Sequence, residues 1–169
     1  MNTPAVAILM GSKNDFPKLK GTVDTLERFG IPCTVRVMSA HRTPATVVCF
    51  VEKAEAEGTQ VFICAAGLAA HLAGVVASHT VRPVIGIPVD GGPLNGLDAL
   101  YATVQMPGGI PVATVAIGSA GATNAAVLAA EILALGNATL TAKLKAFRKE
   151  NAEKVLKDDA ALQAELKAK

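Results

Sequence analysis

Short apolar runs alternate with helix-like segments over residues 5–135, and this alternation is the strongest constraint on the fold. Five runs of aliphatic and β-branched residues are predicted to be strands, at 5–10, 33–38, 61–64, 83–87 and 112–117. Apolar residues at helical spacing predict helices between Asp15 and Gly30 and at 43–57, 69–78, 97–105 and 122–135. Strands that alternate with helices are typical of a parallel sheet covered on both faces. The predicted fold class is therefore α/β, a three-layer αβα sandwich with a central parallel sheet.

Residues 137–169 differ in composition, because Ala, Lys, Glu and Leu predominate there. Apolar residues at helical spacing predict one or two C-terminal helices that pack on the body of the protein or on a neighbouring subunit. A functional basic tail is the less favoured alternative. We predict a single domain over residues 1–169, with an α/β core at 1–136 and a helical extension at 137–169.

Several classes of protein do not fit this sequence. No uninterrupted apolar stretch reaches the roughly 18 residues of a membrane-spanning helix, so no membrane partner is expected. The N-terminus lacks an export signature, and three well-separated cysteines argue against a disulfide framework, so a cytoplasmic location is expected. A net charge of +2 with interspersed signs, and the absence of Trp, argue against a nucleic-acid partner. The cysteines lack C-x-x-C spacing and no element carries three candidate ligands, so no metal site is expected.

Polar and glycine-rich segments follow each predicted strand. Right-handed crossovers bring all these strand exits to one rim of a parallel sheet, where ligands bind in such folds. The exits include Gly11-Ser12 with Asp15, then 39–42, 67–71, 88–92 and 118–121. The first exit could also serve only to cap the following helix, and capping is compatible with anion binding. The convergence of these segments predicts a binding site on that rim.

The loop Ser39-Ala-His-Arg-Thr-Pro44 carries a hydroxyl, an imidazole and a guanidinium. The Arg42 guanidinium is a planar fork suited to phosphate, and imidazole titrates near neutral pH, as an acid/base catalyst requires. A lone loop histidine is more often structural. Because His41 and His71 follow different strands onto the same rim, a shared role in the chemistry of a phosphorylated small molecule is favoured.

Five segments of the chain resemble one known family. The resemblance is carried by Gly11-Ser-Lys-Asn-Asp15, Ser39-Ala-His-Arg-Thr-Pro44, Ala66-Gly-Leu-Ala-Ala-His-Leu72, Pro83-Val-Ile-Gly-Ile-Pro88 and Gln105-Met-Pro-Gly-Gly-Ile-Pro-Val-Ala-Thr-Val-Ala-Ile-Gly118. In this order they resemble the N5-carboxyaminoimidazole ribonucleotide mutases, the class I phosphoribosylaminoimidazole carboxylase catalytic subunits of purine synthesis. The resemblance runs from about residue 5 to 135.

The resemblance implies a flavodoxin-like catalytic domain that assembles as a homo-octamer. The implied reaction moves a carboxylate from the exocyclic nitrogen of the substrate to ring carbon 4, without ATP, metal or another cofactor. If the carboxylate leaves as carbon dioxide and re-adds, a pocket with little water is needed to hold it.

The resemblance also implies a role for each matching residue. The expected phosphate ligands are Ser12, Ser39 and Arg42, and Asp15 is expected to bind the ribose hydroxyls. The base and carboxylate pocket is expected to include Ala66, Gly67 and Leu72. His41 would be the general acid/base, and His71 would lie beside the migrating carboxylate.

Three residues depart from the commonest family pattern: Asn14 replaces Ser, Leu68 replaces Gly, and Ala73 replaces Pro. Leu68 adds bulk beside the expected pocket.

Two alternatives stay open for the function. Class II enzymes carboxylate aminoimidazole ribonucleotide directly with carbon dioxide, but resemble the pattern with a Lys after the loop His and lack the second His, so Arg42 and His71 favour class I. A non-catalytic nucleotide-binding module on the same fold is the other alternative.

Overall fold

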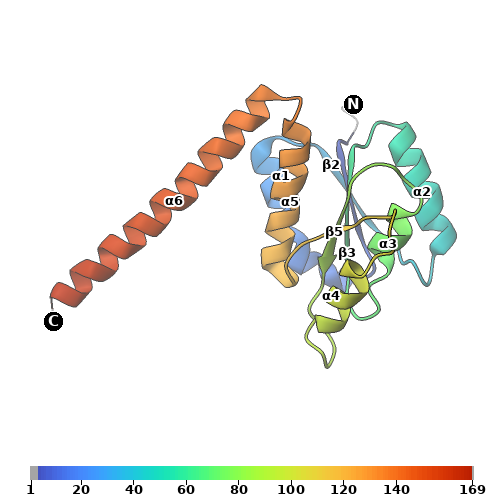
Figure 1. The fold of residues 1–169 in the computed structure, drawn as a ribbon, viewed down its shortest axis with the longest axis horizontal. Helices are drawn as coiled ribbons and strands as arrows, with labels where there is room; N and C mark the ends of the chain where they lie inside the picture. Colours follow the sequence, from blue (N-terminus) through green and yellow to red (C-terminus); the bar gives the residue numbers. More distant parts are fainter. Residues whose placement is uncertain (1–3, 169) are drawn as a thin grey trace. The chain divides into compact units, whose positions relative to one another are not determined.

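The computed structural model describes residues 4–168 and is built around a five-stranded sheet (Figure 1). The strands are β1 (Val6–Met10), β2 (Cys33–Val37), β3 (Val61–Ala66), β4 (Val84–Pro88) and β5 (Ala113–Thr114). All neighbouring strands are parallel, in the order β2-β1-β3-β4-β5. This is the flavodoxin-like strand order, in which the chain reverses its direction of travel across the sheet at β1 and β3. The predicted α/β class with a parallel sheet is confirmed.

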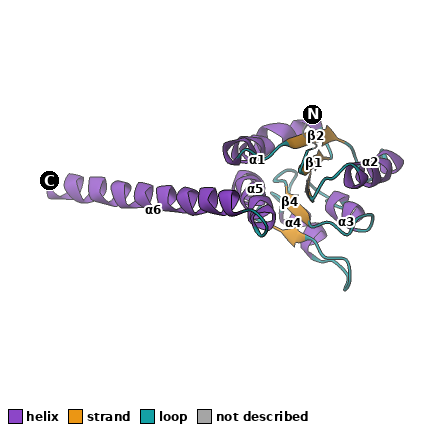
Figure 2. Cartoon of the chain, turned by 90° about the horizontal axis from the view of Figure 1, so that it is seen from above, coloured by secondary structure: helices purple, strands orange, loops and turns teal. Residues whose placement is uncertain are grey.

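The helical elements of the described chain are a short 3-10 helix η1 (Lys13–Asp15), α1 (Phe16–Phe29), α2 (Pro44–Ala56), α3 (Leu72–Ala77), α4 (Leu97–Val104), α5 (Gly118–Ala134) and α6 (Ala138–Lys167). Both faces of the sheet are covered by helices of the first part of the chain. One face carries α1 and α5, and the other carries α2 and α3 (Figures 1 and 2). The α1–α5 contact includes a buried hydrogen bond of 2.8 Å from Thr22 Oγ1 to the carbonyl oxygen of Ala122.

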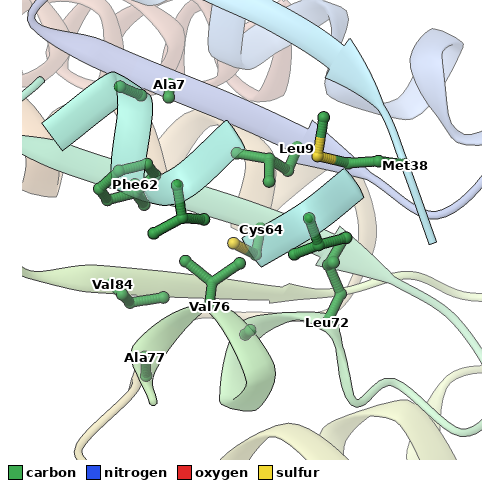
Figure 3. Close-up of a cluster of buried hydrophobic side chains, with 13 residues drawn as sticks. Ala7, Leu9, Met38, Phe62, Cys64, Leu72, Val76, Ala77 and Val84 are labelled. Atoms are coloured by element: carbon green, nitrogen blue, oxygen red, sulfur yellow. The ribbon is translucent and has the colours of Figure 1, made fainter. Parts of the chain in front are cut away.

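The central strands are apolar along their whole length because they are covered on both sides. Every residue of β1 and β4 is buried. On the α2–α3 face, Phe62 and Cys64 of β3 pack with Val76 and Leu72 of α3 (Figure 3). Cys64 is buried within β3, and burial raises the pKa of its thiol, so it acts as a packing residue.

Three element boundaries differ from the prediction. The helix expected at 69–78 begins only at Leu72, because Leu68 has a left-handed φ of 54° and the chain forms a loop up to His71. The last strand, expected at 112–117, pairs with β4 over two residues only, Ala113 and Thr114. In contrast, α5 begins at Gly118, four residues before the expected 122.

The chain divides into two compact units, one ending at Ala130 and the other running from Glu131. The second unit contains α6 as one continuous helix of 30 residues. Asn137 caps it, because its side chain accepts a 3.0 Å hydrogen bond from the Leu140 N–H. All side chains from 151 to 168 are exposed. None of the helices within 4–168 is both long and apolar enough to cross a membrane.

Candidate active site

A cavity of about 390 Å³ lies at the carboxyl ends of β1, β2, β3 and β4. Its walls are the loops that follow these four strands. All nine residues predicted for the site line it: Ser12, Asp15, Ser39, His41, Arg42, Ala66, Gly67, His71 and Leu72. The structure therefore brings the predicted residues together, while the role of each stays a prediction.

The loop after β2 is folded around the Ser39 hydroxyl. Ser39 Oγ accepts hydrogen bonds from the backbone N–H groups of His41 (3.3 Å) and Arg42 (3.2 Å). The Thr43 N–H closes the turn with a 2.9 Å bond to the Ser39 carbonyl oxygen. Because both bonds to Oγ are accepted, the Ser39 O–H remains available as a donor to a bound ligand.

The loops after β1 and β2 are joined by the Arg42 guanidinium. Arg42 Nη2 donates a 2.6 Å hydrogen bond to the carbonyl oxygen of Gly11. This bond fixes the guanidinium at the mouth of the cavity and uses one of its five N–H donors. The neighbouring Ser12 hydroxyl accepts from the Asn14 N–H at 3.2 Å and caps η1. Hydroxyl, guanidinium and helix N-terminus thus lie on one side of the cavity, as an anion requires.

His41 and His71 contact each other directly. His41 Nε2 lies 2.9 Å from His71 Nδ1, and the rings meet edge-on, with planes at 88° and centroids 5.0 Å apart. At this distance the two ring nitrogens can form one hydrogen bond, in which one nitrogen donates and the other accepts. His71 directly precedes α3 and has no side-chain capping bond to the helix, so its ring is free for this contact.

Asp15 is half-buried in the wall formed by the β1 exit. Burial raises the pKa of its carboxyl, while a hydrogen bond from the Ser12 backbone and the charge of Lys18 act in the opposite direction. The partly desolvated carboxylate is suited to accept hydrogen bonds from ligand hydroxyl groups.

The sequence did not single out Lys18 and Asp90. Lys18 Nζ lies 3.0 Å from Asp90 Oδ1 and also donates to the Asp90 carbonyl oxygen. Its hydrogen bond lowers the pKa of the Asp90 carboxyl. The pair joins α1 to the loop after β4, and Asp90 lines the cavity. Asp90 could have been found from its position directly after a strand, whereas nothing marks Lys18 within its helix.

A larger cavity, of about 860 Å³, lies at the opposite edge of the sheet, near the start of β4. Its charged groups are already paired with each other. Arg82 Nε lies 3.4 Å from Glu55 Oε1, and the Thr80 hydroxyl donates to Glu55 Oε2 at 2.5 Å. His79 is there too, away from the histidine pair. No group of three metal-ligating side chains exists within residues 4–168.

The chain is similar to known proteins over most of its length. Residues 5–154 match the family model described as AIR carboxylase. The N5-carboxyaminoimidazole ribonucleotide mutase of Escherichia coli K12 is 49% identical over 158 residues, covering 93% of this chain and 94% of that protein. The enzyme of the same name from Brucella melitensis is 51% identical over 150 residues, which cover 89% of this chain and 93% of that protein. The crystal structure of Treponema denticola PurE superposes with a TM-score of 0.84 at 33% identity, covering 93% of this chain and 97% of that one.

Proposed function

The chain belongs to the AIR carboxylase family, as its motifs predict, and on this premise we propose that it is an N5-carboxyaminoimidazole ribonucleotide mutase. It converts N5-carboxyaminoimidazole ribonucleotide to 4-carboxyaminoimidazole ribonucleotide in purine biosynthesis. The observation that carries this proposal is the 2.9 Å contact between His41 and His71 in a cavity edged with phosphate-type donors.

The substrate phosphate binds at the β1 and β2 exits in this proposal. Ser39 donates its free O–H to a phosphate oxygen, and Arg42 supplies the N–H donors that its bond to Gly11 leaves available. Ser12 adds a second hydroxyl. Asp15 accepts hydrogen bonds from the ribose hydroxyls, a role that its half-buried carboxylate supports.

The histidine pair then moves one proton. The carbamate C–N bond breaks, its electron pair stays on nitrogen, and nitrogen takes up a proton. Carbon 4 attacks the released carbon dioxide, and His41 removes the proton from carbon 4. His71 lies beside the migrating carboxylate, and Ala66, Gly67 and Leu72 line the base pocket. The proton lost at carbon equals the proton gained at nitrogen, so the reaction is an isomerisation and no metal or cofactor enters the scheme.

We also propose that the enzyme works in the cytoplasm as a homo-octamer. Cys33, Cys49 and Cys64 are free thiols, which suits a reducing compartment. Leu97 and Tyr101 lie on one face of α4, and 45% and 58% of their respective surfaces are exposed to solvent. Apolar side chains grouped in this way are typical of protein interfaces.

The decisive experiment offers the purified protein two substrates separately. We expect rapid conversion of N5-carboxyaminoimidazole ribonucleotide at low carbon dioxide. Chromatographic separation of the nucleotides measures this conversion. Conversion of aminoimidazole ribonucleotide with dissolved carbon dioxide, and not of the N5-carboxy compound, would instead identify a class II activity. Binding without turnover of either would identify a non-catalytic module.

A further inference from the structure

Lys18 lies in the first turn of α1, where the helix itself disfavours a cation. The free N–H groups of a helix N-terminus carry partial positive charge, so acidic residues are favoured in this turn. The first turn of α1 has none. Instead, the Lys18 ammonium group contacts both the carboxylate and the carbonyl oxygen of Asp90, in the loop after β4. The contact with Asp90 therefore compensates for the unfavourable position of the lysine.

The contact between Lys18 and Asp90 joins elements from either side of β3. In the sheet, β3 lies between β1 and β4. Lys18 belongs to the helix that follows β1, whereas Asp90 belongs to the loop that follows β4. Asp90 lines the cavity and Lys18 does not. One side chain outside the cavity thus links two walls that are neighbours neither in the sequence nor in the sheet.

The loop after β4 packs closely against the loop after β3. The Val89 N–H donates a 2.9 Å hydrogen bond to the Ala66 carbonyl oxygen. A Cβ placed on Gly67 would lie 3.3 Å from the Val89 carbonyl oxygen. Ala66, Gly67 and Val89 all line the cavity. The position of the loop after β4 therefore affects the width of the cavity on this side.

One oxygen of the Asp90 carboxylate is buried. Half of the Asp90 side chain is exposed, but Oδ1 itself is buried. A Cβ placed on Gly118 would lie 3.1 Å from this oxygen, and Lys18 Nζ is 3.0 Å from it. A carboxylate oxygen removed from water is costly unless a cation or a donor compensates for it. Loss of the lysine charge is therefore expected to displace the loop towards water.

We infer that Lys18 is a positioning residue that sets the width of the cavity by holding the loop after β4 to the start of α1. The identity of the ligand, an aminoimidazole ribonucleotide, rests on the proposed function. In that function Asp15, three residues before Lys18, binds the ribose hydroxyls, and Ala66 and Gly67 line the base pocket. Lys18 keeps these two binding regions at the separation that one nucleotide requires.

The first test measures binding of aminoimidazole ribonucleotide by calorimetry in the absence of carbon dioxide. Lys18→Met removes the charge but keeps an unbranched side chain. We expect Kd to rise on the order of tenfold, because small misplacements of binding groups have effects of this size. Lys18→Arg keeps the charge and should restore most of the affinity. Asp90→Asn should also weaken binding, and the double variant should bind no more weakly than Lys18→Met, because both residues act through one contact.

Lys20→Met is the matched control. Lys20 lies in the same helix and is also paired with a carboxylate, since its Nζ is 2.6 Å from Asp24 Oδ2. This pair is exposed and does not reach the loops around the cavity. We expect wild-type affinity from the control, and circular dichroism checks that every variant is folded.

The pH dependence of turnover separates this role from simple packing. Burial raises the pKa of the Asp15 carboxyl, and the charge of Lys18 opposes this rise. Lys18→Met removes the opposing charge, so the Asp15 pKa should rise further and the carboxylate should become protonated at a higher pH. The acid limb of kcat/KM should then move to higher pH, with KM raised and kcat at the optimum little changed. Asp90→Asn retains the lysine charge and should not move the limb upward.

The other charged or titratable groups in or beside the cavity are the same in Lys18→Met as in the wild type. They are Lys13, His41, Arg42, His71 and Asp90. A shift of the acid limb between these two proteins therefore reports the loss of the Lys18 charge.

Three outcomes would overturn the inference: wild-type affinity in a folded Lys18→Met variant, additive effects of the Lys18 and Asp90 substitutions, or an equal loss of affinity in Lys20→Met. A wild-type protein that binds aminoimidazole ribonucleotide but turns over neither nucleotide would overturn the proposed mutase function alone. The binding measurements would then still decide the role of Lys18. Absence of any binding by the wild type would overturn both.

Discussion

The direct contact between two imidazoles is the central feature at the scale of single residues. His41 Nε2 and His71 Nδ1 are 2.9 Å apart, so a proton taken up by one ring can be passed to the other without a large movement. The phosphate-type donors, in contrast, are held by bonds to the backbone, such as that from Arg42 to Gly11. In the proposed mechanism, the groups that move a proton are thus separate from the groups that hold the ligand in place.

This separation predicts different kinetic effects of two substitutions. His41→Asn removes the acid/base group and should lower kcat by about 100-fold or more, with little change in KM. Arg42→Ala removes a charged donor to the phosphate and should chiefly raise KM. Steady-state kinetics with N5-carboxyaminoimidazole ribonucleotide would measure both.

Circular dichroism of each variant is the control for folding. Near-normal turnover by a folded His41→Asn variant would rule out the acid/base role. An Arg42→Ala variant that lost only its rate at saturation would contradict the phosphate role.

The position of these residues could be predicted because each directly follows a strand, and parallel topology brings strand ends together. Lys18 could not be predicted in the same way. Its side chain reaches Asp90 from within a helix, and a contact between residues 72 positions apart leaves no local signal. The left-handed φ of Leu68 was also invisible, since leucine rarely adopts it.

At the scale of the elements, the start of α5 depends on one glycine. A Cβ placed on Gly121 would overlap the carbonyl group of Ala116. Gly121→Ala should therefore lower the free energy of unfolding by about 1–3 kcal/mol, as overpacking does, although alanine favours a helix. Chemical denaturation would measure the change.

Gly21→Ala is the matched control within α1. A Cβ there would lie 3.1 Å from the Thr123 hydroxyl, which is a side-chain atom. We expect this variant to be close to wild type in stability. Equal stability of the two variants would contradict the steric account of Gly121.

Strands were easier to predict than the ends of helices. The central strands are buried on both faces, so their apolar runs match their limits closely. The start of α3 was wrong by three residues because its first apparent turn is the loop that presents His71. The last strand was too long because an apolar run does not reveal how many of its residues pair with a neighbouring strand.

At the scale of the whole molecule, exposed apolar side chains predict assembly. Besides Leu97 and Tyr101 on α4, the apolar residues Val155, Leu162 and Leu166 on α6 have 51–66% of their surface exposed to solvent. We expect light scattering to give a mass about eight times the 17.2 kDa of one chain. A monomeric or dimeric mass at micromolar concentration would contradict the proposed octamer.

The histidine contact also bears on how the protein is made. His41 follows β2 and His71 follows β3, and these two strands lie on either side of β1. The contact therefore spans the strand at which the chain reverses its course across the sheet. During synthesis, the ribosome must have released β3 before His41 and His71 can meet. Pairing of β1 with β2 alone cannot form the histidine contact. Recovery of activity during refolding accordingly reports the long-range β1–β3 pairing, and not merely the local β1–α1–β2 unit.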